Sequence, residues 1–392
     1  MTDRTGTPLT WNQRLDAPSR PAQSRLRESW NLFVSNRLAI AGFVIFLVFF
    51  FLAILGVFLT SGTQPVCDPS LVRLEEKLRP PLSRPNVNVL SSQEIPPLKI
   101  YLLGTDELGR DVFSRMLQGA WVSLTVGFVA VGISVLIGVF MGGMAGYFGQ
   151  NYVKSGHVLG VVLIGAGFAL LGMERWTAFS LFLIAGAAVF FFSGGYLRSW
   201  SRGPGNTSFP AVLHLPVMTV DTLIMRTVDI MLCFPSFFLI LTVVAILPAS
   251  MYNIMIVIGL TSWMGAARFV RAEFLSLREQ DFVTAAKALG VGKFRIIFRH
   301  MMPNALGPVL VSATIGIASA ILTEAGLSFL GFGVPPPHAT WGNILSDGKN
   351  FIFDAPWLTY IPGIAILVVV LSFNLFGEGL RDILNPKLRE RP

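Results

Sequence analysis

Long apolar stretches alternate with short polar ones along most of this chain, and the alternation predicts a series of membrane-spanning helices. Six of the apolar stretches approach or exceed the roughly 20 helical residues that cross a bilayer core. They cover 38–60, 120–147, 221–247, 251–270, 305–321 and a final stretch that ends near 376. The pattern predicts an all-α polytopic membrane protein with about six core transmembrane helices.

A further pair of apolar stretches, 157–173 and 177–197, interrupts this series. Two spans joined by a tight turn at Glu174-Arg175-Trp176 would preserve the orientation of all that follows. The first stretch is short for a span, about 25 Å at 1.5 Å per residue, so a re-entrant hairpin is the alternative. With both stretches crossing, the total is about eight transmembrane helices.

Composition agrees with this class of fold and excludes others. Hydrophobic residues make up 53% of the 392 residues and charged residues 13%, with a mean hydropathy of +0.64, which is too apolar for a soluble domain. The net charge of +8 does not indicate nucleic acid, because the basic residues flank the predicted spans, where positive charge sets orientation. Cys67 and Cys233 are expected to be free thiols. The histidines show no metal-ligand spacing, and no catalytic motif occurs, so we expect no metal site and no enzyme activity.

The distribution of Lys and Arg predicts cytoplasmic termini. The first 37 residues carry six basic and three acidic residues, and the segment 268–299 carries seven and three. By contrast, the loop 61–119 has seven of each, which suits the outer side. The predicted organisation is a tail and interfacial helix at 1–37, a first span at 38–60, an external loop at 61–119, a second span at 120–150, an inserted hairpin and linker at 151–219, a core membrane domain at 220–377 with a cytoplasmic loop at 271–304, and a tail at 378–392.

The polar, basic stretch 281–303 predicts two short helices with a break at Gly290, since glycine tolerates the left-handed conformation at a helix end. Asp281 is the expected N-cap of the first helix, and Pro303 is expected to end the second. One face of the first helix is made of Phe282, Ala285, Ala286 and Leu289. One side of the second is made of Phe294, Ile297, Phe298 and Met301. Such an amphipathic pair between spans indicates a docking surface, or alternatively a loop lying on the lipid surface.

The order Thr284-Ala285-Ala286, Gly290, then His300-Met301-Met302-Pro303 resembles the EAA loop of ATP-binding-cassette (ABC) importer permeases. Thr284 stands where Glu is usual and Met302 where Leu is usual. In that family the loop forms coupling helices that contact an ATPase subunit. The resemblance implies ATPase coupling by Asp281, Phe282, Thr284, Ala285, Ala286, Leu289, Gly290, Lys293, Phe294, Arg295, Phe298, Arg299, Met302 and Pro303.

A second motif, LGTDELGRD at 103–111, resembles a signature of the dipeptide and oligopeptide branch of the same family, as does the region from GFGV at 331–334 to Trp341-Gly342-Asn343. Two i,i+4 ion pairs are expected here, Asp106 with Arg110 and Asp111 with Arg115. The functional interpretation is a rim contacted by an external binding protein; the alternative is a pinned loop before the next span. The rim candidates are Thr105, Asp106, Gly109, Arg110 and Asp111.

Three charged residues are candidates for a gate or pathway. Arg226 and Asp229 lie at i,i+3 near one end of the span 221–247 and are expected to pair with each other, whereas Glu324 could line the pathway or reach water. In addition, Pro235 should kink the span 221–247. The stripe Gly138, Gly142 and Gly146 is expected to pack against another helix. Trp357 and Tyr360 are expected interfacial anchors of the last span.

Together, the resemblance implies the type I ABC importer permease fold and one transmembrane subunit of an ATP-driven importer of di- or oligopeptides or related solutes. It further implies a second permease subunit, one or two ABC ATPase subunits that hold ATP and magnesium, an extracytoplasmic solute-binding protein, and a prokaryotic inner membrane. The insertion at 151–219 departs from the usual family pattern. The alternative function is an ion-coupled secondary transporter, for which we find neither clear midplane carboxylates nor clear repeats.

Overall fold

A computed structural model describes residues 33–34, 36–62, 65–88, 90–91, 94–154 and 216–384. The predicted tails and the two apolar stretches of the insertion therefore lie outside the described residues or at their margin. Within the described part, five helices are long and apolar enough to cross a membrane, and a sixth crossing is formed if one bent pair of helices counts as a single span. The chain is an all-α polytopic membrane protein.

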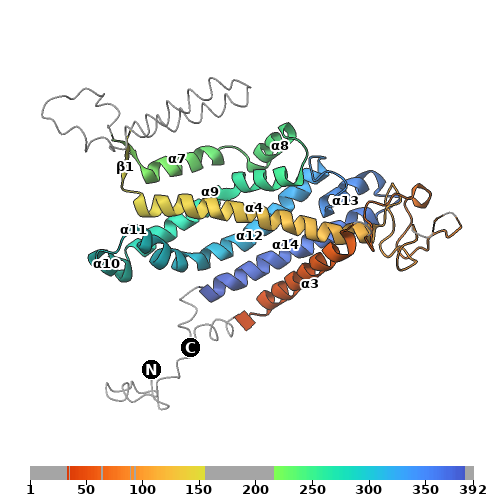
Figure 1. Ribbon diagram of the computed structural model, residues 1–392, viewed down its shortest axis with the longest axis horizontal. Coiled ribbons are helices and arrows are strands. Elements are labelled where there is room, and N and C mark those ends of the chain that lie inside the picture. The colour runs from red at the N-terminus through yellow and green to blue at the C-terminus, as the bar shows by residue number, and fades with distance from the viewer. Residues whose placement is uncertain are drawn as a thin grey trace, which may run out of the picture.

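The membrane helices run back and forth along the long axis of the molecule (Figure 1). They are α3 (Arg37–Thr60), α4 (Val112–Phe148), the pair α7 (Val220–Leu232) and α8 (Ser236–Ile246), α9 (Met251–Arg278), α12 (Met302–Phe329) and α14 (Trp357–Leu384). Short helices sit at the two ends of the bundle: α10 (Asp281–Ala288), α11 (Lys293–Arg295) and the π-helix η4 (Ile296–Met301) at one, and α13 (Trp341–Gly348) with the 3-10 turns η1 (Leu74–Glu76) and η5 (Lys349–Phe351) at the other.

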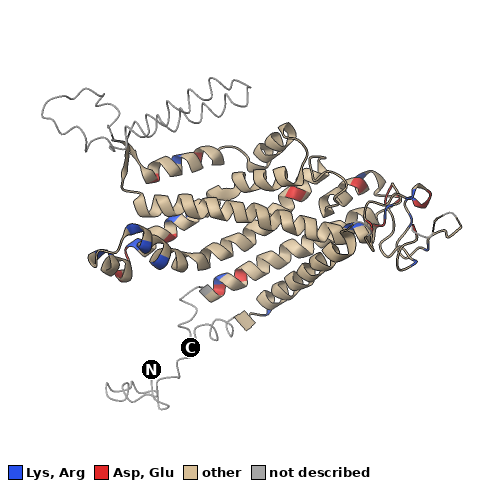
Figure 2. Ribbon diagram, in the orientation of Figure 1, with Lys and Arg blue, Asp and Glu red and all other residues tan. Residues whose placement is uncertain are grey.

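Charged residues gather at the two ends of the bundle, and the helices between them are uncharged over most of their length (Figure 2). Lys and Arg are concentrated around α10 and α11. The opposite end carries charges of both signs in the segment 65–111. This separation is the one expected of a protein whose middle lies in hydrocarbon, where a charge is costly.

Small residues allow the first and last membrane helices to pack closely. At Gly42 of α3 an added Cβ would meet the backbone of Ser372 and Phe376 on α14, and at Gly379 of α14 it would meet Ala39. A hydrogen bond from Asn36 Nδ2 to Asp382 Oδ2, 3.1 Å long, joins the same two helices where α3 begins and α14 ends. The two helices are therefore antiparallel neighbours.

The predicted glycine stripe of α4 is confirmed as a packing surface. Added Cβ atoms at Gly138, Gly142 and Gly146 would all meet atoms of α9. Without side chains at these positions, the two backbones can approach, and van der Waals contact replaces the hydrophobic effect that is missing in lipid. The stripe therefore positions α9 and the segment that follows it.

The span that contains Pro235 breaks rather than kinks. Helix α7 ends at Leu232, α8 begins at Ser236, and their axes differ by 81°. Proline lacks the N–H that a continuous helix needs at this point, and Pro235 occupies the N-cap of the new helix.

Two short strands join the ends of the insertion. Strand β1 (Tyr152–Lys154) pairs antiparallel with β2 (Pro216–Thr219), with Tyr152 opposite Thr219. The chain thus leaves and re-enters the described structure at neighbouring points, and the helix after the insertion starts at the end of the bundle where α4 stops (Figure 1).

Several helices extend beyond the apolar stretches that predicted them. Helix α4 begins at Val112 instead of 120, α9 continues to Arg278 instead of 270, α12 covers Met302–Phe329 instead of 305–321, and α14 continues to Leu384 instead of 376. The apolar pattern marks the part of a helix in hydrocarbon, whereas backbone hydrogen bonding continues into the polar ends.

Candidate functional site

The candidate docking site is the polar end of the bundle formed by α10, α11 and η4, residues 281–301, which we call the α10 cap. Gly290 separates α10 from α11 with a φ of +71°, a value that glycine adopts without steric cost. Its N–H donates to the carbonyl of Lys287 and the N–H of Val291 to that of Ala286. The predicted break at Gly290 is confirmed.

The second half of the α10 cap runs without interruption into the membrane. Pro303 was expected to end this helix, and that expectation is wrong: Pro303 lies in the first turn of α12, where a missing N–H is tolerated. The backbone before it winds as a π-helix, with the Met302 N–H donating to Ile297 O. As a result, Lys293–Phe329 is one helical span of 37 residues.

The buried face of the α10 cap is not made of the same residues as the apolar faces that the spacing grouped together. Val283 and Ala286 of α10, with Ile296, Ile297 and Met301 of η4, are buried against Phe274 of α9 and Val309 of α12. Of the predicted apolar face of α10, only Ala286 is buried. The expected N-cap is also wrong, because Gln280 occupies that position, where its side chain accepts no hydrogen bond from a described N–H group of the first turn, while Asp281 is the first helical residue.

Large apolar side chains cover the outward face. Leu289 is 83% exposed, Phe294 77%, Phe298 59% and Phe282 40%. The rings of Phe294 and Phe298 stack in parallel with their centroids 6.1 Å apart. Isolated apolar residues on a surface need no explanation, but a cluster at the polar end of a membrane protein marks an interaction site.

Basic residues lie next to these aromatic residues along the chain. Lys287, Lys293, Arg295 and Arg299 are all exposed, and none of them forms an ion pair with the residues that the structure describes. The Lys293 ammonium lies 6.0 Å from the ring centre of Phe148, where α4 ends. Thr284, at the position where the family usually has Glu, is exposed and its hydroxyl donates to Gln280 O at 3.3 Å. The surface is aromatic and basic, and suits a partner that offers a groove with acidic edges.

The signature LGTDELGRD lies at the other end of the bundle, in what we call the α13 cap: residues 65–111 together with α13. Here Asp106 is fully buried. Its carboxylate accepts from the backbone N–H of Leu108 at 2.9 Å and of Arg110 at 2.8 Å, and from the side chains of Arg110 and Arg115 at 2.6 Å each. The predicted pair Asp106–Arg110 is confirmed.

The second predicted pair, Asp111 with Arg115, does not form. Asp111 is the N-cap of α4 and accepts from the backbone N–H of Phe113 and Ser114. Burial raises the pKa of Asp111 above its ordinary value, although the hydrogen bonds from Ser114 and Phe113 oppose this. Arg115 pairs with Asp106 and with Asp347 of α13, whose Oδ2 is 2.9 Å from Arg115 Nη2 and 3.1 Å from Arg110 Nη2.

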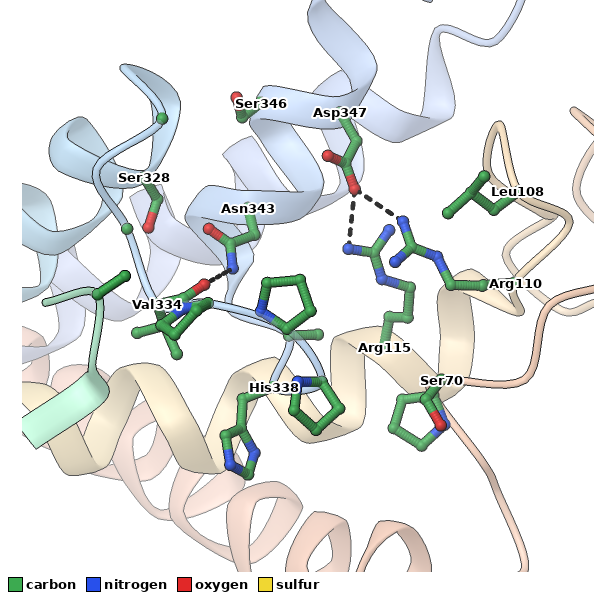
Figure 3. A pocket seen from close by; sticks show the side chains of 18 of the residues that line it. Ser70, Leu108, Arg110, Arg115, Ser328, Val334, His338, Asn343, Ser346 and Asp347 are labelled. Carbon is green, nitrogen blue, oxygen red and sulfur yellow. Dashed lines mark hydrogen bonds and ion pairs between the residues drawn. The ribbon is translucent and has the colours of Figure 1, made fainter.

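These arginines and Asp347 border a cavity of about 600 Å³ at the α13 end (Figure 3). Figure 3 shows both guanidinium groups pointing toward the same carboxylate oxygen of Asp347. Of the five rim candidates, Thr105, Asp106 and Asp111 are buried, and a Cβ at Gly109 would collide with the carbonyl of Arg73. The geometry therefore favours the pinned-loop interpretation: the motif ties the segment 65–111 to α4 and α13.

Trp357 also belongs to this end. It was expected at the membrane interface, but it is buried and its Nε1 donates to Thr105 O at 3.2 Å. Tyr360, its expected companion, is 51% exposed. Tyr101, beneath the same loop, is fully buried, and burial raises its pKa to about 12.

The gate candidates fall into two different environments. The side chains of Arg226 and Asp229 are 75% and 45% exposed and form the expected ion pair at 3.9 Å. Asp229 forms a closer ion pair, at 2.6 Å, with Arg268 of α9. Glu324 neither lines an open path nor reaches water. Its side chain is fully buried between Ser328, at 2.6 Å, and Ser123, at 3.4 Å.

Sequence reasoning missed the residues that complete these networks. Asp347, Arg268 and the pair of Asp221 with Arg271 join helices that are far apart along the chain. Spacing within one helix carries no signal for such partners. The only signal in the sequence was that each of these residues is charged, and this signal does not identify the partner.

Among the described residues no group of three or more His, Cys, Asp or Glu is arranged to hold a metal ion. At the α10 cap the described side chains that face outward include large apolar residues and cations.

Comparison with known proteins identifies relatives over 94–98% of the chain. Residues 211–390 match the model of the binding-protein-dependent transport system inner membrane component, and residues 24–74 match that of the N-terminal transmembrane domain of oligopeptide transport permease C. A dipeptide transport system permease protein of Alkalihalophilus pseudofirmus is 34% identical over 368 residues, covering 94% of this chain and 92% of the relative. The corresponding protein of Haemophilus influenzae is 32% identical, covering 98% and 99%. An oligopeptide transport system permease protein of Bacillus subtilis is 30% identical, covering 95% and 93%.

These matches extend across both caps and the helices between them. The family interpretation of the three sequence motifs is confirmed, and the secondary-transporter alternative is not supported. The chain therefore belongs to the binding-protein-dependent transport permeases, in the branch with the dipeptide and oligopeptide permeases, and is a permease subunit of an ABC importer.

Proposed function

We propose that this chain forms half of the translocation pathway of a peptide importer and receives the force of ATP hydrolysis through the α10 cap. Relatives at 30–34% identity carry the names of dipeptide and oligopeptide permeases, which supports di- or oligopeptides as the solute. The observation that carries the docking role is the exposed aromatic pair Phe294 and Phe298, on a surface whose basic residues form no ion pair with the part of the chain that the structure describes.

The connections of the α10 cap suit a lever. Phe294 and Phe298 lie at the start of a helix of 37 residues that continues into the membrane as α12. The other half of the α10 cap follows α9 after two residues. Buried contacts of Val283 and Ile297 with Phe274 and Val309 join the two halves. Movement of the α10 cap would therefore tilt α9 and α12 together, as rigid helices do in alternating access.

The partners follow from this arrangement. One or two ABC ATPase subunits hold ATP and magnesium and hydrolyse ATP, whereas this chain is not catalytic. A second permease subunit supplies the other half of the pathway, and an extracytoplasmic binding protein delivers the solute. The excess of Lys and Arg around the α10 cap supports a cytoplasmic position for it and for both termini, in the inner membrane of a prokaryote.

A charge substitution tests the docking role. We expect Phe294→Asp to remove the co-purifying ATPase subunits and to reduce ATP-driven uptake at least tenfold, because an anion replaces a large apolar contact. The matched control is Phe353→Asp, at a phenylalanine that is 95% exposed but lies just after η5, at the α13 end. Both variants should reach the membrane in normal amounts. Retention of ATPase subunits by Phe294→Asp would contradict the proposal.

A further inference from the structure

A cavity of about 250 Å³ lies between α4, α9 and α12. Each helix contributes residues at helical spacing, so that one face of each helix lines it. The residues from α12 are Ser312, Ile315, Gly316, Ser319, Ala320 and Thr323. The positions are near the middle of all three helices, which places the cavity halfway across the bundle.

The lining of the cavity is hydroxylic and uncharged. Its polar side chains are Ser134 of α4, Ser262 of α9, and Ser312, Ser319 and Thr323 of α12, and it includes no Asp, Glu, Lys or Arg. The Thr323 hydroxyl donates to Ser319 O at 2.8 Å. The other four hydroxyls have no hydrogen-bond partner among the described residues. In hydrocarbon an unsatisfied polar group is costly, which argues that this face does not contact lipid tails.

Helix α3 shows what a lipid-facing surface of this molecule looks like. Only 17% of the most apolar 18-residue stretch of α3 is buried, and the helix contains no Ser or Thr between Arg37 and Leu59. The surface at the cavity differs from that of α3, because it exposes the hydroxyl-bearing residues Ser262 and Ser319 in the single chain.

We infer that this hydroxylic face is the part of the translocation pathway that contacts the solute, and that it recognises the backbone amides of a peptide rather than its side chains. The inference rests on the proposed function. Serine and threonine hydroxyls both donate and accept, as amide N–H and C=O groups require. An uncharged lining neither attracts nor repels charged side chains, so peptides of different sequence can pass.

The size of the cavity fits a shared site. Complete ligand pockets measure roughly 300–1,000 Å³, and one permease subunit supplies about 250 Å³. Small residues keep this space open. At Gly265 of α9, which is exposed and lines the cavity, an added Cβ would meet nothing within 4 Å.

Gly265 allows the pathway to be filled without disturbing the packing of the helices. We expect Gly265→Trp to reduce ATP-driven uptake of isotope-labelled alanyl-alanine at least tenfold in proteoliposomes that contain the complete importer. Gly265→Ala should keep at least half of the wild-type uptake. The control is Gly132→Trp: Gly132 of α4 also has nothing within 4 Å of an added Cβ, is exposed, and does not line the cavity. Its uptake should stay within twofold of wild type.

Two outcomes would overturn the inference. Wild-type uptake by a Gly265→Trp importer would show that the solute passes elsewhere. Loss of the second permease from the purified Gly265→Trp complex, with Gly132→Trp intact, would show that the face is a protein interface.

A second measurement does not depend on the solute and separates this inference from the proposed function. In a Cys233→Ser background, Ser319→Cys should react with a water-soluble maleimide in intact membranes at least tenfold faster than Leu322→Cys, which is on the same helix, 50% exposed, and outside the cavity. Equal rates would overturn the hydrophilic pathway. If Ser319→Cys reacts rapidly but the wild-type importer takes up no peptide, the pathway stands and the proposed peptide substrate fails.

Discussion

The α10 cap and the α13 cap are both polar segments at the ends of the same bundle, and they use their polar residues in opposite ways. In the α13 cap, Asp106 is fully buried and satisfied by four donors. In the α10 cap, the basic side chains are exposed and have no ion-pair partner among the described residues, and the aromatic residues Phe294 and Phe298 face outward. The first region satisfies its charges internally, whereas the second leaves its cations and aromatic rings exposed, as the proposed docking of an ATPase requires.

This contrast teaches that a polar motif between membrane spans does not reveal its role until burial is known. Both motifs resemble family signatures, and the sequence left two interpretations open for LGTDELGRD, a rim contacted by a binding protein and a pinned loop. In the α10 cap, Thr284, Ala285 and Gly290 of the motif are exposed, although Ala286 and Met301 are buried. In the α13 cap the motif residues form the connections that fix α4 against α13.

The largest difference between the caps is expected at two glycines with the same φ of +71°. At Gly109 an added Cβ would collide with the carbonyl of Arg73, whereas at Gly290 it would meet nothing within 4 Å. Gly109→Ala should therefore prevent stable folding of the α13 cap and remove most of the monodisperse protein in detergent. Gly290→Ala should lower the free energy of unfolding by only about 1–2 kcal/mol, the cost of placing a residue with a Cβ in the left-handed conformation. Similar thermal stability of the two variants would remove the contrast.

The second largest effect is expected at the buried carboxylate. Asp106→Ala leaves Arg115, with a side chain only 4% exposed, without its closest partner, and breaking a buried ion pair costs about 3–5 kcal/mol. The comparison is Glu279→Ala, beside the α10 cap. Glu279 pairs with Arg278 at the surface and is 74% exposed, so its removal should lower the free energy of unfolding by only about 0–1 kcal/mol. Denaturation of both variants measures the difference. Equal losses would show that burial does not distinguish the two regions.

A smaller effect is expected at the start of α4. Asp111→Ala removes the side chain that accepts from the N–H of Phe113 and Ser114, and loss of an N-cap costs about 0.5–2 kcal/mol. Asp111→Asn should be nearly neutral, because Asn caps about as well as Asp. Thermal unfolding of the pair tests this. An equally large loss in Asp111→Asn would assign the effect to charge instead of capping.

How much of this architecture could be predicted depends on whether the signal is local. The break at Gly290 and the packing of Gly138, Gly142 and Gly146 depend on neighbouring backbone and on helical period, and both were predicted correctly. The exposure of Phe294 and Phe298 agrees with the coupling role that the resemblance implied for them. The burial of Ile297 and Met301, which the spacing grouped on the same side, was not predicted, because four apolar residues on a short helix do not reveal which of them face the bundle. The choice of Arg115 between Asp111 and the distant Asp347 depends on tertiary structure, which spacing does not encode.

The smallest predicted effect concerns pH. Burial raises the pKa of Tyr101 from 10.0 to about 12, so between these values the unfolded chain releases a proton that the folded chain retains. Stability contributed by the neutral phenol is complete below pH 10 and is lost as the pH rises to about 12. The Tyr101 hydroxyl is buried and has no hydrogen-bond partner among the described residues, so Tyr101→Phe should be nearly neutral at pH 7. At pH 11 the variant should unfold at a higher temperature than wild type. If the difference in unfolding temperature between variant and wild type is the same at pH 7 and pH 11, the raised pKa does not belong to Tyr101.

The central claim is that the α10 cap is the surface on which the ATPase docks. The most direct measurement places the photoreactive residue benzoylphenylalanine at Phe298, and in a separate variant at Phe353, in cells that express the complete importer. We predict a crosslink from position 298 to an ATPase subunit that changes in yield when ATP hydrolysis is blocked, and none from position 353. A crosslink from 298 only to lipid, or to an ATPase from 353, would contradict the account.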